Sequence, residues 1–207
     1  MKTRPSVLTW IKTIGPGKAD GRLKKLYDRI AGPDGQIDNI LAAHSLRPHT
    51  LEGHMALYKH VLHNTANHLP KGYLEAIGVY VSMLNQCAYC VEHHFAGLAR
   101  LVGDSEQSDA MRTALAAGNP TQAFDAKESA GLIYAAQLTT TPNSLSEADI
   151  NALRESGFDD GEILEINQVA AYFSYANRTV LGLGVNPDGE ALGLSPNSSD
   201  GEDWSHG

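Results

Sequence analysis

Two cysteines and a histidine are spaced so that a helix would align their reactive groups. Cys87, Cys90 and His94 stand at positions i, i+3 and i+7, which lie along one helical face. Thiolate is the reactive form of cysteine, and the start of a helix favours it, so the pKa of a cysteine at that position should fall. His94, four residues beyond Cys90, can relay a proton to or from a thiol. The pattern predicts a dithiol redox site.

The same residues permit other interpretations. Two cysteines can pack as small buried hydrophobes, or they can form half of a zinc site completed by His94 and one more ligand. The chain has only these two cysteines and therefore no second pair, which weakens the zinc interpretation. His93, three residues after Cys90, is an alternative relay base. No glycine-rich nucleotide loop occurs, and thiol chemistry requires no haem, flavin or metal, so we expect no cofactor.

Glu75 can join this site only if the chain reverses direction. It lies twelve residues before Cys87, a distance of about 18 Å along one continuous helix. An antiparallel helical hairpin turning near Asn85 and Gln86 would instead bring Glu75 back opposite His94. There its carboxylate could orient the imidazole or a water molecule, and burial would raise its pKa.

The hydrophobic periodicity predicts an all-α protein, since helical spacing recurs and no alternating run or Asn-Gly hairpin signal appears. Proline, glycine and capping residues set the expected bounds. The capping-box spacing occurs at Ser144 with Glu147 and at Asp159 with Glu162. The expected helices cover residues 20–31, 38–44, a stretch opened by Pro48, 70–84, 87–101, 105 or 108 to 117, 121–138, about 147–156, and 160–182.

Composition limits the functional classes. With 207 residues and 42% hydrophobic residues, we expect one domain over residues 1–186, followed by a tail over 187–207 that is mobile or docks on a partner. The net charge of −8 argues against nucleic-acid binding. No apolar run approaches the ~18 residues needed to cross a bilayer, and no secretory signal is visible. We therefore expect a soluble, cytoplasmic protein without membrane partners.

The order Glu75, Cys87, Cys90, His94 resembles the alkylhydroperoxidase D (AhpD) and carboxymuconolactone decarboxylase superfamily, and in particular its peroxidase-related branch. The likeness is strongest over a core of about residues 50–130, and the segments 40–44, 145–149 and 170–178 extend it. The resemblance implies an all-α AhpD-like domain with a helical hairpin that carries Cys-x-x-Cys. It also implies a homo-oligomer, a trimer or a hexamer.

Roles for the site residues follow from this resemblance. Cys90 would be the peroxidatic thiol that becomes a sulfenic acid, Cys87 the proton donor and resolving thiol, and Glu75 with His94 the relay. Family members commonly have histidine where this chain has Tyr89, so Tyr89 is a candidate auxiliary residue. His93, the alternative relay base, is another.

The expected function is reduction of hydrogen peroxide or organic hydroperoxides, with an external dithiol as reductant. The alternatives are a disulfide reductase, a carboxymuconolactone decarboxylase-type enzyme, or a non-catalytic redox-sensing oligomer.

Other histidines and aromatic residues are expected to have structural roles. The spacing of the histidines matches no known metal site, and the aromatic segment near the C-terminus is interpreted as core or interface packing. These residues are His44, His54, His60, His63 and His68, and Tyr172, Phe173, Tyr175, Asn177 and Arg178.

Overall fold

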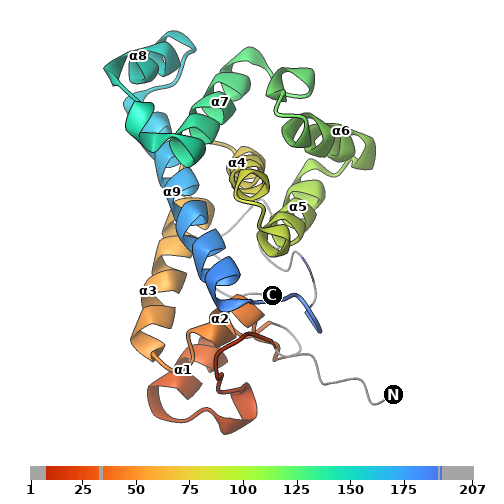
Figure 1. Cartoon of the computed structure of the whole chain (residues 1–207), viewed down its shortest axis with the longest axis vertical. Helices are drawn as coiled ribbons and strands as arrows, with labels where there is room; N and C mark the ends of the chain where they lie inside the picture. Colours follow the sequence, from red (N-terminus) through yellow and green to blue (C-terminus); the bar gives the residue numbers. More distant parts are fainter. Residues whose placement is uncertain (1–7, 33–34, 191, 193–207) are drawn as a thin grey trace.

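The computed structural model describes residues 8–32, 35–190 and 192, and every regular element in that part of the chain is helical (Figure 1). The predicted all-α class is therefore confirmed. The elements are, in chain order, the 3₁₀ turn η1 (Pro16–Lys18), α1 (Gly21–Ile30), α2 (Asn39–Ala43), α3 (Pro48–Tyr58), the π-helical η2 (Lys59–His63), α4 (Lys71–Leu84), α5 (Ala88–Val102), α6 (Ser105–Ala116), η3 (Pro120–Gln122), α7 (Ala126–Thr140), η4 (Pro142–Ser144), α8 (Glu147–Glu155) and α9 (Asp160–Leu183).

Helix α4 is the centre of the molecule. Its residues 73–82 are all buried, which is the pattern of a helix enclosed on every side. Figure 1 looks along α4 and shows α5, α6, α7 and α9 around it, and the residue contacts agree. Gly78 allows α9 to approach closely, because a Cβ there would lie 2.2 Å from the ring of Phe173. This packing brings residues of α9 next to the α4–α5 connection.

Helix α9 is fixed at both ends. At its start Asp159 and Glu162 form the predicted capping box. At its end Gly184 takes a left-handed conformation with φ 61°, and the indole of Trp10 lies where a Cβ would be. The Trp10 amide donates to the Leu183 carbonyl at 2.8 Å. The N-terminal segment thus packs on the C-terminal end of α9.

Two sequence expectations about helix starts were wrong. The helix expected over 121–138 begins at Ala126, because Asp125 and Glu128 form a capping box after the short turn η3. The box expected at Ser144 with Glu147 lies two residues later, where the Ser146 amide donates to the Asp149 carboxylate at 2.7 Å. Ser144 instead donates its hydroxyl hydrogen to the Thr141 carbonyl and closes η4. In segments that precede a helix, several side chains could accept the hydrogen bond that caps it, and tertiary packing decides which of them does.

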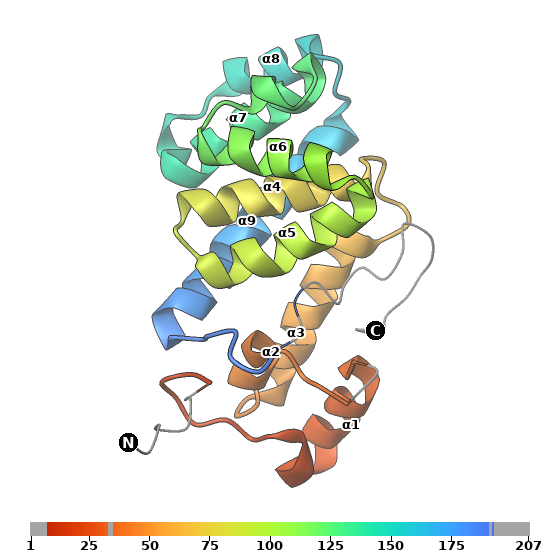
Figure 2. The ribbon, with the colours of Figure 1, turned by 90° about the vertical axis from the view of Figure 1, so that its right-hand side faces the viewer.

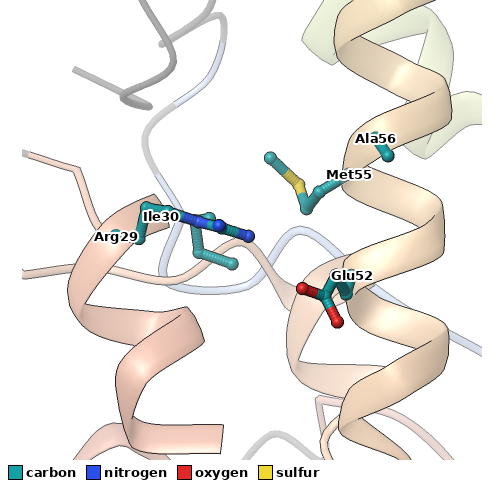
Figure 3. Close-up of a pocket in the computed structure, with 5 residues that line it drawn as sticks. All are labelled: Arg29, Ile30, Glu52, Met55 and Ala56. Atoms are coloured by element: carbon teal, nitrogen blue, oxygen red, sulfur yellow. The ribbon is translucent and has the colours of Figure 1, made fainter. Parts of the chain in front are cut away.

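The helices of the described ranges include none that combines the length and apolarity needed to cross a membrane. A pocket of about 450 Å³ opens between α1 and α3, and Figure 3 shows its lining. None of the predicted site residues lines it; the lining residues are Arg29, Ile30, Glu52, Met55 and Ala56.

Candidate active site

A tight connection between α4 and α5 places the two cysteines. Gln86 adopts φ 57°, a conformation uncommon for a residue other than glycine, and Cys87 follows as the N-cap of α5. The Cys87 amide donates to the Ser82 carbonyl at 2.9 Å, which ties the turn to the last turn of α4. The two helices then pack against each other along their lengths (Figure 2). The chain therefore reverses where the sequence analysis required it to.

The two thiols are buried and interact with each other. Cys87 is 0% exposed and Cys90 is 3% exposed, and both are free thiols. Hydrogen bonds from the thiol and amide of Cys90 lower the pKa of Cys87, which is the direction predicted for a cysteine at a helix start. The same thiol pairing, followed by burial, raises the pKa of Cys90. The two pKa values thus shift in opposite directions, which makes Cys87 the more acidic thiol of the pair.

Glu75 and His94 meet across the two helices. Nδ1 of His94 lies 2.7 Å from Oε2 of Glu75, and the Glu75 side chain is 1% exposed. The ring of Phe173 packs edge-on against the imidazole, with centroids 4.5 Å apart. A carboxylate at Glu75 only accepts hydrogen bonds, so in that form it holds the proton on Nδ1 and leaves Nε2 as the basic nitrogen. The pair is suited to relay protons.

Glu75 also has a buried oxygen with no protein partner. Its Oε1 is inaccessible and makes no hydrogen bond to any described residue. Buried polar atoms are nearly always satisfied, so such an atom marks a place for a water molecule or a polar group of a substrate. This feature belongs to the same dyad that the sequence identified.

His93 forms a separate cluster on another face of α5. Its Nε2 lies 3.2 Å from Oε2 of Glu190, and the Tyr89 hydroxyl donates to Oε1 of Glu190 at 3.0 Å. Burial and the nearby Glu190 raise the pKa of Asp38 to about 6, although the two histidines oppose the shift. Tyr89 and His93 are thus close to the thiols in sequence, but their polar groups pair with Glu190.

Sequence reasoning missed three residues of this region. Glu190 lies in the segment that was assigned to the tail, and Asp38 was read only as the start of a short helix. Asn177 of α9 was assigned to packing, yet its side chain bonds Ser82 and Asn85 at the turn before Cys87 and influences the pKa of both cysteines. Asp38 stands at a capping-type position before a short helix, and this was the one local signal in the sequence. Asn177 and Glu190 reach the site only through contacts with residues more than 80 positions away. Among the predicted tail residues, 191 and 193–207, including Trp204, lie outside the described part of the chain.

An apolar cover lies over the thiols. Cys87 and Cys90 pack in one cluster with Tyr89 of α5, Ala43 of α2, Val180 near the end of α9 and Val185 in the segment that follows it. Among the described residues, no group of three or more histidine, cysteine or acidic side chains is arranged to hold a metal ion.

Comparison with known proteins agrees with this fold. The model of the carboxymuconolactone decarboxylase family matches residues 48–137, which confirms the resemblance inferred from the sequence over this part of the chain. The matched range contains the Glu75–His94 dyad and both cysteines. A search of curated proteins gives no significant match.

Solved structures share the fold over nearly the whole chain. An uncharacterized peroxidase-related protein from Silicibacter sp. TM1040 is 26% identical, with a TM-score of 0.76 and coverage of 91% of this chain and 96% of that one. The AhpD core protein from Ralstonia eutropha JMP134, also described as peroxidase-related, is 23% identical, with a TM-score of 0.77 and coverages of 89% and 95%. The debrominase Bmp8 is 18% identical, with a TM-score of 0.69 and coverages of 88% and 92%.

Proposed function

We propose that this protein is a thiol-dependent peroxidase that reduces hydrogen peroxide or organic hydroperoxides through Cys87 and Cys90. The observation that carries the proposal is the pair of buried thiols at the start of α5, whose pKa values shift in opposite directions, on the helix that also carries His94 of the Glu75–His94 dyad. Peroxidase-related structures of the same fold support it.

In the resting state Cys87 is the thiolate, and it acts first as a base and then as a proton donor. Its thiolate first takes the proton of Cys90, so that the Cys90 thiolate attacks one peroxide oxygen and the O–O bond breaks. The departing alkoxide takes a proton from the Cys87 thiol and leaves as the alcohol, or as water when the substrate is hydrogen peroxide. Cys90 is then a sulfenic acid, and Cys87 is again a thiolate.

The second half of the cycle closes the disulfide. The Cys87 thiolate attacks the sulfenic sulfur of Cys90 and the S–O bond breaks; the hydroxide leaves as water with the proton that His94 took up when Cys87 first ionised. One hydroperoxide and two thiols thus yield an alcohol, a water and a disulfide. An external dithiol restores the pair by exchange and becomes a disulfide itself. Because both sulfurs are buried, the reductant reaches them only when the apolar cover moves.

The test is steady-state consumption of hydrogen peroxide and of an organic hydroperoxide with several dithiol donors. The proposal predicts turnover with one dithiol oxidised per peroxide, and its loss in Cys90→Ser. Consumption that stops after one equivalent would mean a redox sensor. Dithiol oxidation by a small disulfide, without peroxide turnover, would mean a disulfide reductase. Since a debrominase variant of this fold was solved with 2,3,4-tribromopyrrole, that compound is a useful third substrate.

A further inference from the structure

The amide of Asn177 is held in one orientation beside the thiols. Asn177 belongs to α9 and is 0% exposed. Its Oδ1 accepts a hydrogen bond from Asn85 Nδ2 at 2.9 Å, and its Nδ2 donates to Ser82 Oγ at 3.0 Å. In this arrangement the nitrogen end of the amide faces Ser82 and the oxygen end faces Asn85, and the second N–H of Nδ2 remains available as a donor.

The nitrogen end of the amide faces the turn that carries Cys87, because Ser82 accepts from Asn177 with its hydroxyl and from the Cys87 amide with its carbonyl. Asn177 contributes to the lowered pKa of Cys87 and opposes the raised pKa of Cys90. The two residues that orient the amide belong to the same turn, since the carbonyl of Ser82 accepts from the Cys87 amide. The turn, the thiols and α9 therefore form one hydrogen-bonded unit.

We propose that Asn177 is a further catalytic residue, whose Nδ2 donates to the negative charge of the dithiol on whichever sulfur carries it. The charge moves from Cys87 to Cys90 before attack and returns to Cys87 afterwards. With the sulfurs almost completely shielded from water, a fixed donor that reaches both replaces solvation at each position. The catalytic role of Asn177 rests on the proposed function, but its stabilisation of the thiolate can be measured without peroxide.

The measurement is the pH titration of thiolate absorbance in the reduced full-length protein, with Cys87→Ser and Cys90→Ser used to assign the signal. Loss of a hydrogen bond to a charged group should raise the lower thiol pKa by about one unit in Asn177→Ala. Asn177→Asp keeps the size of the side chain but replaces the donor with a carboxylate oxygen, so it should raise the thiol pKa further.

Asn167→Ala is the matched control. Asn167 lies on the same helix, and its Nδ2 donates to the Tyr134 hydroxyl at 2.8 Å. Removing it deletes a comparable interhelical hydrogen bond, so stability should fall while the thiol titration stays as in the wild type. Ser82→Ala gives a milder test that does not alter Asn177 itself; it frees one contact of the amide and should shift the thiol pKa in the same direction by less.

The outcomes separate this inference from the proposed function. Raised thiol pKa values in the Asn177 variants support the inference even if the wild-type protein consumes no peroxide. If Asn177→Ala titrates like the wild type and loses only stability, as Asn167→Ala should, then Asn177 is a packing residue. If Asn177→Ala does not fold, an unchanged titration in both Asn177→Asp and Ser82→Ala overturns the inference equally.

Discussion

The division of charge between the two thiols is the main result at the scale of single residues. The family resemblance assigns the attack to Cys90, whereas hydrogen bonding places the first negative charge on Cys87. The two observations are compatible when Cys87 acts as the base that ionises Cys90. The proposed reaction then starts within the thiol pair itself. The His94–Glu75 dyad takes up and returns the proton that the thiol pair loses and the departing hydroxide needs.

The first prediction concerns the attacking sulfur. In Cys87→Ser, Cys90 should react more slowly, because its base is gone, but one sulfenic acid should accumulate there, because the resolving thiol is gone too; a sulfenic-selective reagent with peptide mass spectrometry should locate it. Cys90→Ser should react with peroxide far more slowly, because a hydroxyl is not ionised near neutral pH. Rapid formation of a sulfenic acid at Cys87 in Cys90→Ser would reverse the assignment.

The second prediction separates the two adjacent histidines. Since His94 contacts Glu75 while His93 contacts Glu190, only His94 is placed in the proposed relay. His94→Ala should slow disulfide formation by about 10²-fold, the lower end of the range for general acid–base catalysis, because His94 supplies the proton for the departing hydroxide. His93→Ala is the matched control and should change this rate little, as rapid mixing with peroxide can show. Equal loss in both variants would contradict the assignment of the relay to His94.

Local spacing in the sequence predicted four residues of the candidate site, and their positions explain why such a prediction was possible. Cys87, Cys90 and His94 share one helix, so helical geometry relates them directly, and a single chain reversal was enough to include Glu75. Asn177 and Glu190 approach the site from α9 and from the segment after it. No periodicity relates them to the cysteines, so only the packed structure places them there.

At the scale of elements, the contacts of Glu190 join three parts of the chain. Glu190 contacts the amide of Asn39 at the start of α2, and the side chains of Tyr89 and His93 on α5. The same segments supply much of the cover over the thiols. Sequence analysis located α2 and α5 within a few residues, but it separated residues 187–190 from the domain because the segment has little apolar material to bury.

The third prediction concerns the pH dependence of this junction. The folded-state pKa of Asp38 is raised from 3.8 to about 6 by burial and by Glu190, while His93 and His94 oppose the shift. The protonated carboxyl therefore stabilises the fold below pH 3.8, and that contribution is lost as the pH rises through about 6. Asp38→Asn should raise the free energy of unfolding at neutral pH by about 1–3 kcal/mol and by much less at acidic pH. Denaturant titrations at both pH values measure this; an equal change at both would contradict it.

At the scale of the whole molecule, the all-α class followed from the uninterrupted helical periodicity. The central position of α4 could have been anticipated from its nearly continuous apolar residues, but the order of its neighbours could not. Close packing at Gly78 and Phe173 depends on the shapes of two helices that are far apart in the sequence. Such complementarity leaves no trace in the pattern of either helix alone.

The fourth prediction is self-association. Along α9, Leu164, Tyr175 and Leu181 are 54%, 41% and 46% exposed, which leaves apolar surface for a subunit contact. Light scattering on the pure protein should therefore give a mass of several chains, in accord with the trimer or hexamer that the family resemblance implies. A strict monomer at high concentration would refute the oligomer without affecting the dithiol site.

The fifth prediction tests the dithiol cycle by intact-protein mass spectrometry of a single turnover. Fully reduced protein is mixed with one equivalent of peroxide and then acid-quenched. We predict a loss of two hydrogen atoms, mapped to a disulfide between Cys87 and Cys90, that a dithiol reverses and that neither single-serine variant can form. A chain that consumes peroxide repeatedly while both thiols stay reduced, or that reacts with no peroxide at all, would contradict the proposal that this pair is a peroxide-reducing centre.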